Sequence, residues 1–198
     1  MIEFNTALFL TLGNEGTYSN NTHDVGGETF MGIARNYNPD WTGWKIIDTL
    51  DKSKLKKCNI LTEHPNLYCS MAAYYKEHYW NKILGNKLGD QWVANKLFDV
   101  AVNMGPPRAI KFLQESLNLL NKDGKLYQDL NVDGIIGNVT LTTLTSYRRF
   151  DPIRTLIKFI TLLQAEHYIN YIRKSSSQEE FARGWVNRLH IKINNLPE

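Results

Sequence analysis

The chain contains few cysteines and no long apolar run. Its 198 residues include two cysteines, Cys58 and Cys69, which are too few for a disulfide-stabilised scaffold. Ten residues separate them, so the sequence fits either one disulfide or two reduced thiols. No segment approaches the ~20 apolar residues of a membrane-spanning helix, and we therefore expect no stable membrane insertion.

The N-terminus lacks the features of a secretory signal. The apolar run ALFLTLG is short, and it follows Glu3 rather than a group of lysines or arginines. We therefore expect the protein to be made in the cytoplasm without a signal peptide. Any function outside the cytoplasm would then need another route of export.

The sequence shows no pattern typical of a metal site, a cofactor site or a covalent nucleophile. Its five histidines have no ligand spacing, and it has no serine or cysteine nucleophile motif and no phosphate-binding glycine loop. We predict no metal and no cofactor. The formal net charge of +3 is a mild basic bias that suits an anionic polymer but is common among soluble proteins, and we expect no nucleic-acid partner.

The hydrophobic pattern predicts a mainly α-helical protein with one small β-hairpin. A content of 42% hydrophobic residues is enough for one sizeable core, and we expect a monomer. Residues 14–29, rich in asparagine and glycine, are typical of a loop or short hairpin, and residues 51–68 of an irregular connection. Apolar spacing predicts helices over 2–13, 41–50, 70–84, 90–104, 105–121, 139–150 and 152–174, and one or two helical turns over 30–37.

Two carboxylic acids flank a glycine-rich turn in the stretch GNEGTYSNNTHDVGGET. Glu15 follows a predicted helix, where apolar neighbours would raise its pKa and keep it protonated. Asp24 lies in a polar turn that would keep it ionised, and Thr29 is suited to hold a water molecule beside it. Such an acid/base pair fits the hydrolysis of a glycosidic bond. Spacing alone favours a solvated helix end for Glu15 and an ordinary turn aspartate for Asp24.

This stretch resembles the opening of the glycoside hydrolase 108 family of bacterial and phage N-acetylmuramidases. The resemblance implies a lysozyme-like helical fold, with a small β-hairpin beside the active-site cleft and Glu15 as the residue essential for catalysis. Thr17 departs from the family motif, where a second glycine is found. The residues that match are Glu15, Gly16, Tyr18, Asp24, Gly26, Gly27, Thr29, Gly32 and Ile33.

The resemblance extends over nearly the whole chain. The stretches LFDVAVNMGPPRAIKFLQESLN, VDGIIGNVTLTTL and FARGWVNRL are similar to the predicted peptidoglycan-binding region that accompanies this catalytic segment. It implies a catalytic segment over residues 1–90 and a peptidoglycan-binding region over 91–198, packed into one globular core. The implied partner is the glycan strand of peptidoglycan. Action at the cell wall or periplasm would then follow holin-type release or dedicated secretion.

Several further residues are candidates for substrate binding. Tyr18 is suited either to stack on a sugar ring or to pack under the hairpin. Gly27 and Gly32 would let the backbone approach a bulky sugar. Asn103 stands at a predicted helix end, where its amide would either hold a glycan group or cap the helix. Trp41 and Trp44 fit the core better than a sugar platform.

The sequence therefore favours a muramidase that cleaves the β-1,4 bond between N-acetylmuramic acid and N-acetylglucosamine. In this hypothesis Glu15 is the general acid, and Asp24 with Thr29 activates water, which gives inversion; a closer pair of carboxyl groups would favour retention. One alternative is a non-catalytic peptidoglycan-binding or secretion-associated protein with the same fold. A lytic transglycosylase is a third, disfavoured because it needs no water-activating aspartate.

Overall fold

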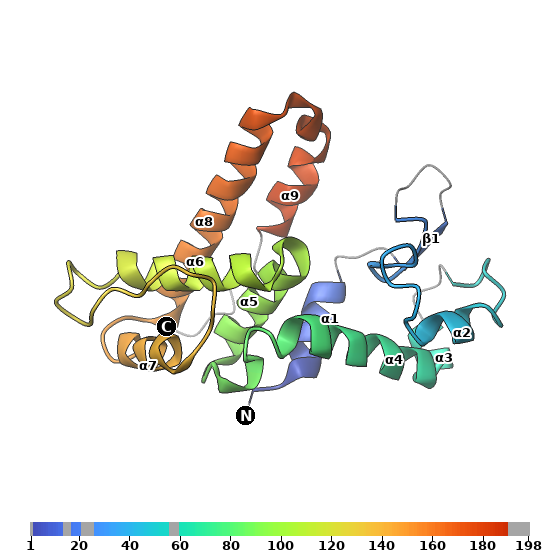
Figure 1. Cartoon of the computed structure of the whole chain (residues 1–198), viewed down its shortest axis with the longest axis horizontal. Helices are drawn as coiled ribbons and strands as arrows, with labels where there is room; N and C mark the ends of the chain where they lie inside the picture. The colour runs from blue at the N-terminus through green and yellow to red at the C-terminus, as the bar shows by residue number, and fades with distance from the viewer. Residues whose placement is uncertain (1, 14–16, 21–25, 56–59, 190–198) are drawn as a thin grey trace. The chain divides into compact units, whose positions relative to one another are not determined.

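The computed structural model describes residues 2–13, 17–20, 26–55 and 60–189 (Figure 1). They fall into two compact units. One is Leu8–His78, and the other combines Met1–Ala7 with Tyr79–Glu198. The architecture is mainly helical with one small antiparallel sheet, which confirms the predicted fold class. Among the described residues, no helix has the length and apolar character needed to span a membrane.

The helices of the first unit follow the predicted pattern at its start and depart from it later. Helix α1 (Phe4–Leu12) ends as predicted at Gly13, whose N–H donates to the carbonyl of Phe9 at 3.1 Å. The segment 60–68, predicted to be irregular, instead contains α3 (Ile60–Glu63) and the first turn of α4 (Pro65–Tyr75). Helix α4 can begin at a proline because the first-turn N–H groups lack intrahelical partners. The other helical elements of this unit are α2 (Gly43–Ile47) and η1 (Lys76–Trp80), a π-helical turn that enters the second unit.

The sheet has three short strands, one more than a hairpin. Strands β1 (Tyr18–Asn20), β2 (Glu28–Phe30) and β3 (Ile33–Ala34) pair antiparallel in sequence order. The helical turns predicted over 30–37 are absent from residues 30–34, because β2 and β3 are joined there by a two-residue turn. One turn does follow, in which the N–H of Asn38 donates to the carbonyl of Ala34 at 3.0 Å. Met31 and Gly32, at φ 47° and 80°, both have the positive φ of a type I′ turn, which matches the twist of paired strands.

Aromatic side chains form the core beside this sheet. The ring of Phe30, which is fully buried, stacks on Trp41 with centroids 6.2 Å apart. Trp41 in turn meets Trp44 edge to face at 5.0 Å. The indole N–H of Trp44 donates to the carbonyl of Asn38 at 2.7 Å. Both tryptophans are buried, which confirms their assignment to the core.

The second unit is built on three long helices. Helices α5 (Gln91–Met104) and α6 (Pro106–Leu119) pack against each other, and α8 (Ile153–Lys174) packs on both (Figure 1). Asp90 caps α5 by accepting from two first-turn N–H groups, and Gly105, at φ 85°, separates α5 from α6. The remaining elements are η2 (Gly85–Lys87), α7 (Asn138–Tyr147), η3 (Ser176–Phe181) and α9 (Ala182–Arg188).

Side-chain amides of α6 hold the long connection to α7. The carbonyl oxygen of Gln114 accepts from the N–H of Gly134, and its NH₂ group donates to Asp133. Asn118 makes the same reciprocal pair with the backbone of Leu130. These contacts satisfy backbone groups that a strand would otherwise pair, so a segment with no helix or strand stays ordered. The stretch DGIIG is a tight turn, with Gly134 at φ 79°.

A lysine lies inside the second unit. The side chain of Lys96 is 2% exposed, and its ammonium donates to the amide oxygen of Gln164 on α8 at 2.6 Å. Burial lowers the pKa of Lys96 to about 8, and the charge of Asp99 opposes this shift. In the unfolded chain the pKa is the ordinary 10.5. Below pH 8 the folded protein therefore carries the cost of a buried charge.

We predict that the free energy of unfolding rises by about 2 kcal/mol between pH 7.5 and 9.5, because the unfolded chain keeps the Lys96 proton that the folded chain loses. Urea unfolding followed by tryptophan fluorescence measures this change. The variant Lys96→Met should lack this component of the pH dependence. Parallel curves for the variant and the wild type would show that the lysine is not responsible.

Candidate active site

Four of the predicted site residues lie on the small sheet. Tyr18 is in β1, Thr29 is in β2, Gly27 directly precedes β2, and Gly32 is in the turn to β3. Glu15 and Asp24 lie outside the described residues. Along the sequence, Glu15 precedes Tyr18 by three residues and Asp24 precedes Glu28 by four. Each proposed catalytic acid thus lies within four residues of a strand of this sheet in the sequence.

Thr29 sits in the middle strand. Its backbone pairs with Ser19 on one side and with Ala34 on the other. Its hydroxyl donates to the carbonyl of Gly27 at 3.2 Å. Because the hydroxyl proton is used in this bond, the oxygen lone pairs are the part of Thr29 suited to a water molecule, which would donate to them.

The two glycines of the predicted site are required by the backbone itself. Gly27 has φ 66°, and a Cβ placed there would lie 2.9 Å from the side-chain nitrogen of Asn36. Gly32 has φ 80°, and its Cβ would lie 2.9 Å from the hydroxyl of Tyr75. That hydroxyl donates to the carbonyl of Met31 at 2.6 Å, which fixes it against the turn. Contact with a sugar stays a prediction for both glycines.

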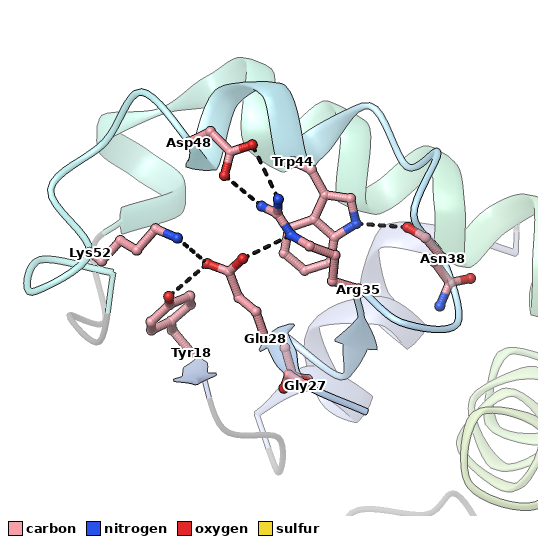
Figure 2. Close-up of polar contacts among 9 residues, drawn as sticks. Tyr18, Gly27, Glu28, Arg35, Asn38, Trp44, Asp48 and Lys52 are labelled. Carbon is pink, nitrogen blue, oxygen red and sulfur yellow. Dashed lines mark hydrogen bonds and ion pairs between the residues drawn. The ribbon is translucent and has the colours of Figure 1, made fainter. Parts of the chain in front are cut away.

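The partly buried carboxylate of Glu28 connects the sheet to the helical part of the unit (Figure 2). Oε1 of Glu28 accepts from the Tyr18 hydroxyl and from the Lys52 ammonium, each at 2.7 Å. Oε2 forms an ion pair with Nε of Arg35 at 2.8 Å. The Glu28 side chain is only 10% exposed, so these contacts replace most of its water. We refer to Tyr18, Glu28, Arg35, Asp48 and Lys52 as the Glu28 cluster.

Arg35 extends the cluster to α2. Its guanidinium makes two hydrogen bonds to the carboxylate of Asp48, at 2.6 and 3.2 Å. It also lies over the ring of Trp44, 4.4 Å from the centroid, in a cation–π contact. Since Trp44 is buried, the arginine rests on a fixed surface. Glu28 and Asp48 balance the charges of Arg35 and Lys52.

The protonation states of the cluster follow from these contacts. Burial alone would raise the pKa of Glu28, but hydrogen bonds from Lys52 and Tyr18 and the charge of Arg35 outweigh it and lower the pKa. The pKa of Tyr18 is raised by burial and by its hydrogen bond to Glu28. Glu28 is therefore ionised and Tyr18 neutral near pH 7. A carboxylate in this state accepts hydrogen bonds and has no proton to donate.

Asn103 belongs to the other compact unit. It lies near the end of α5, and its amide oxygen accepts from the Tyr168 hydroxyl of α8 at 2.8 Å. The same hydroxyl accepts from Gln164 at 3.3 Å, which joins Asn103 to the Lys96 pair. In this structure the side chain of Asn103 links two helices. Glycan binding by Asn103 stays a prediction.

The described residues provide no site for metal or thiol chemistry. Within the described ranges, no three residues among His, Cys, Asp and Glu cluster in a way that could hold a metal ion. Cys69 is an exposed free thiol on α4. Cys58 lies outside the described residues.

Comparison with known families identifies both halves of the chain. Residues 8–105 match the glycosyl hydrolase 108 family, and residues 108–190 match the predicted peptidoglycan domain. The chain carries a glycosyl hydrolase family 108 domain followed by a predicted peptidoglycan domain. The resemblance seen in the sequence is confirmed. The division into segments 1–90 and 91–198 stays a prediction.

A solved structure shares the fold. The structure of Brucella abortus SagA superposes with a TM-score of 0.58 and covers 94% of this chain and 88% of its own. The two sequences are 23% identical, so the likeness establishes the fold of the glycosyl hydrolase 108 chain and nothing of its chemistry. No curated protein sequence is significantly similar to the chain.

Sequence reasoning missed the Glu28 cluster. Glu28 stands between a predicted glycine turn and Thr29, and the sequence alone assigned it no role. The signal was the alternation of Glu28 and Phe30, which places both on one face of a strand, followed by the cation Arg35. The partners Asp48 and Lys52 were not predictable, since they come from beyond the sheet.

We predict that Gly32→Ala lowers the free energy of unfolding by ~2–3 kcal/mol, because it combines positive-φ strain with a clash against the Tyr75 hydroxyl. Urea unfolding measures the loss. Gly124→Ala is the matched control, because Gly124 has φ 73° and nothing lies within 4 Å of its added Cβ. It should lose only about 1 kcal/mol from strain. Equal losses would show that the Tyr75 contact is unimportant.

Proposed function

We propose that the chain is an N-acetylmuramidase that hydrolyses the β-1,4 bond between N-acetylmuramic acid and N-acetylglucosamine in peptidoglycan. The proposal rests on one observation, the presence of a glycosyl hydrolase 108 domain and a predicted peptidoglycan domain in the same chain. The first supplies the reaction class and the second the polymer. Which glycosidic bond is cleaved is tested by mass analysis of the fragments that the enzyme releases.

Glu15 is the proposed general acid. A glycosidase needs one carboxylic acid that stays protonated to donate to the leaving oxygen. Among the described strand residues of the sheet, Glu28 is the carboxyl group, and it is ionised, accepts two hydrogen bonds and forms an ion pair with Arg35. The acid must therefore come from outside the strands. Glu15 fits by its family motif and by its position three residues before β1.

Asp24 and Thr29 are the proposed water-activating pair. Asp24 would accept a proton from the attacking water while that water donates its other proton to the Thr29 oxygen. The Thr29 hydroxyl supports this division, since it already donates to Gly27. Attack on the face opposite the leaving group inverts the anomeric carbon.

Three of the four proposed substrate contacts lie on or beside the same sheet, and the fourth, Asn103, is in α5. Tyr18 would offer its ring to a sugar face, since Glu28 holds its hydroxyl and the side chain is half-buried. Gly27 and Gly32 would leave the backbone accessible to a sugar. Asn103 would bind through its NH₂ group, because its oxygen accepts from Tyr168.

The proposed substrate sets the place of action. Peptidoglycan lies outside the cytoplasmic membrane, so the enzyme would act at the cell wall or in the periplasm. Holin-type release or dedicated secretion would bring it there. The protein is proposed to act as a monomer.

We predict that Glu15→Gln lowers the rate of wall hydrolysis by ~10²–10⁴, because a positioned acid contributes about that factor. Release of reducing ends from purified peptidoglycan, with mass analysis of the fragments, measures the activity. Glu166→Gln makes the same change on the exposed face of α8 and should keep the wild-type rate.

Each alternative has its own outcome in this assay. Wild-type activity in Glu15→Gln would remove Glu15 from the mechanism. Wall binding without reducing ends, in the unmodified protein, would favour a non-catalytic wall-binding role. Products with anhydro ends would identify a lytic transglycosylase.

The stereochemistry gives a further prediction. Water activated by Asp24 should yield the α-anomer as the first product from a β-linked glycan. Proton NMR of the anomeric signal, recorded before mutarotation, distinguishes the anomers. A β-anomer formed first would make Asp24 a nucleophile and the mechanism retaining.

A further inference from the structure

We propose that Glu28 is a positioning residue of the active site, which fixes Tyr18 and the paired strands β1 and β2, next to which the proposed catalytic acids lie in the sequence. The inference deepens the proposed function and rests on it. Glu28 touches no reacting atom in the proposed mechanism. It acts through the side chains and strands that it holds.

The contact between Tyr18 and Glu28 crosses the strand pair diagonally. Tyr18 is paired with Phe30, and Glu28 is paired with Asn20, at the last step of the register. Side chains two positions apart share a face, so Tyr18 and Glu28 are diagonal neighbours within reach of an aromatic side chain. Their 2.7 Å hydrogen bond therefore links the first residue of β1 to the first residue of β2.

The two strands that this hydrogen bond links are next to the two proposed acids in the sequence. The chain from Asn20 to Glu28 contains Asp24, and the chain before Tyr18 contains Glu15. The N–H of Met31 also donates to the carbonyl of Thr17 at 2.7 Å, so pairing continues toward Glu15. Any change in the relation of β1 to β2 moves the points at which both acids are attached.

The Glu28 cluster makes the link between β1 and β2 rigid, because the cationic partners of Glu28 are anchored to other parts of the unit. Lys52 follows α2, and Arg35 bridges Glu28 to Asp48 at the end of α2 while it covers the buried ring of Trp44. A short sheet of this kind has little stability alone. The ion pairs join it to a helix and to the aromatic core.

A neutral amide cannot replace the carboxylate at this position. Glutamine keeps one oxygen acceptor, but its NH₂ group would face Arg35 or Lys52, which are donors only. At least one of the three contacts of Glu28 would then be lost, and two cations would remain beside the Tyr18 hydroxyl. We expect Tyr18 and the strand ends to shift as a result. Small displacements of reacting groups lower rates steeply.

The first arm of the experiment compares Glu28→Gln with the wild type on soluble, peptide-free glycan strands of peptidoglycan. We expect kcat to fall ~10-fold or more while KM changes by less than about threefold, because the lost term is alignment of the reacting groups. The pH–rate profile should keep the same number of ionisations, since Glu28 does not exchange a proton in the reaction. Asp40→Asn, an exposed carboxyl change in the same unit, should match the wild type.

The second arm measures the contact without relying on activity. In protein labelled with ¹³C at tyrosine Cζ, NMR titration follows Tyr18, which Tyr18→Phe identifies. Glu28→Gln should lower the pKa of Tyr18, because the hydrogen bond and the charge of Glu28 both raise it. An unchanged Tyr18 titration would overturn the inference by showing that the contact is absent. A lowered pKa with wild-type kcat would overturn it too, since the contact would not position the site.

The two arms also separate this inference from the proposed function. If the wild type releases no fragments from walls, the muramidase proposal fails, and the positioning role fails with it, whereas the titration still reports the Tyr18–Glu28 contact. If Glu28→Gln does not fold, Tyr18→Phe removes the same hydrogen bond and keeps the ring, with Tyr37→Phe as the control at an exposed tyrosine. Wild-type kcat in Tyr18→Phe would then overturn the inference.

Discussion

The small sheet of the glycosyl hydrolase domain depends on one partly buried carboxylate, Glu28. Its strands are three, three and two residues long, and so short a sheet buries too little surface to be stable alone. Trp44 takes part in both interactions that stabilise the sheet, the aromatic packing and the ion pairs. One edge of its ring meets Trp41, which stacks on Phe30, and its face lies under Arg35, the partner of Glu28. Apolar packing and ion pairing thus stabilise the same strands.

In the second unit, polar side chains order a long connection that has no helix or strand. A connection of nearly twenty residues between α6 and α7 contains no helix or strand among its described residues, and long segments of this kind are uncommon in compact domains unless something orders them. Gln114 and Asn118 supply both a donor and an acceptor to the connection, as a neighbouring strand would. Lys96 and Gln164 make a comparable contact between α5 and α8. Buried polar groups that are satisfied in this way specify one arrangement of the helices.

Local signals allowed much of the helical fold to be predicted, whereas long-range contacts decided the rest. The cap Asp90 and the apolar positions of α5 lie within the helix that they specify, so their pattern is visible in sequence. The turn at Met31 is not, because methionine rarely adopts positive φ, and the pairing of β2 with β3 imposes it. The role of Glu28 depends on Lys52, twenty-four residues away, which no spacing rule connects to it. Glu15 was identified through the family motif, since its position alone also fits a solvated helix end.

The neutrality of the Glu28 cluster bears on the chemistry proposed for its neighbours. A general acid must keep its proton near neutral pH, and an unbalanced cation close by would lower its pKa. Arg35 and Lys52 are two cations beside the strand that Asp24 precedes by four residues, but Glu28 and Asp48 offset both charges. Their combined field therefore falls off faster with distance than that of isolated ions. Under the proposed mechanism, the same contacts that fix the strands also keep these two cations from lowering the pKa of a nearby general acid.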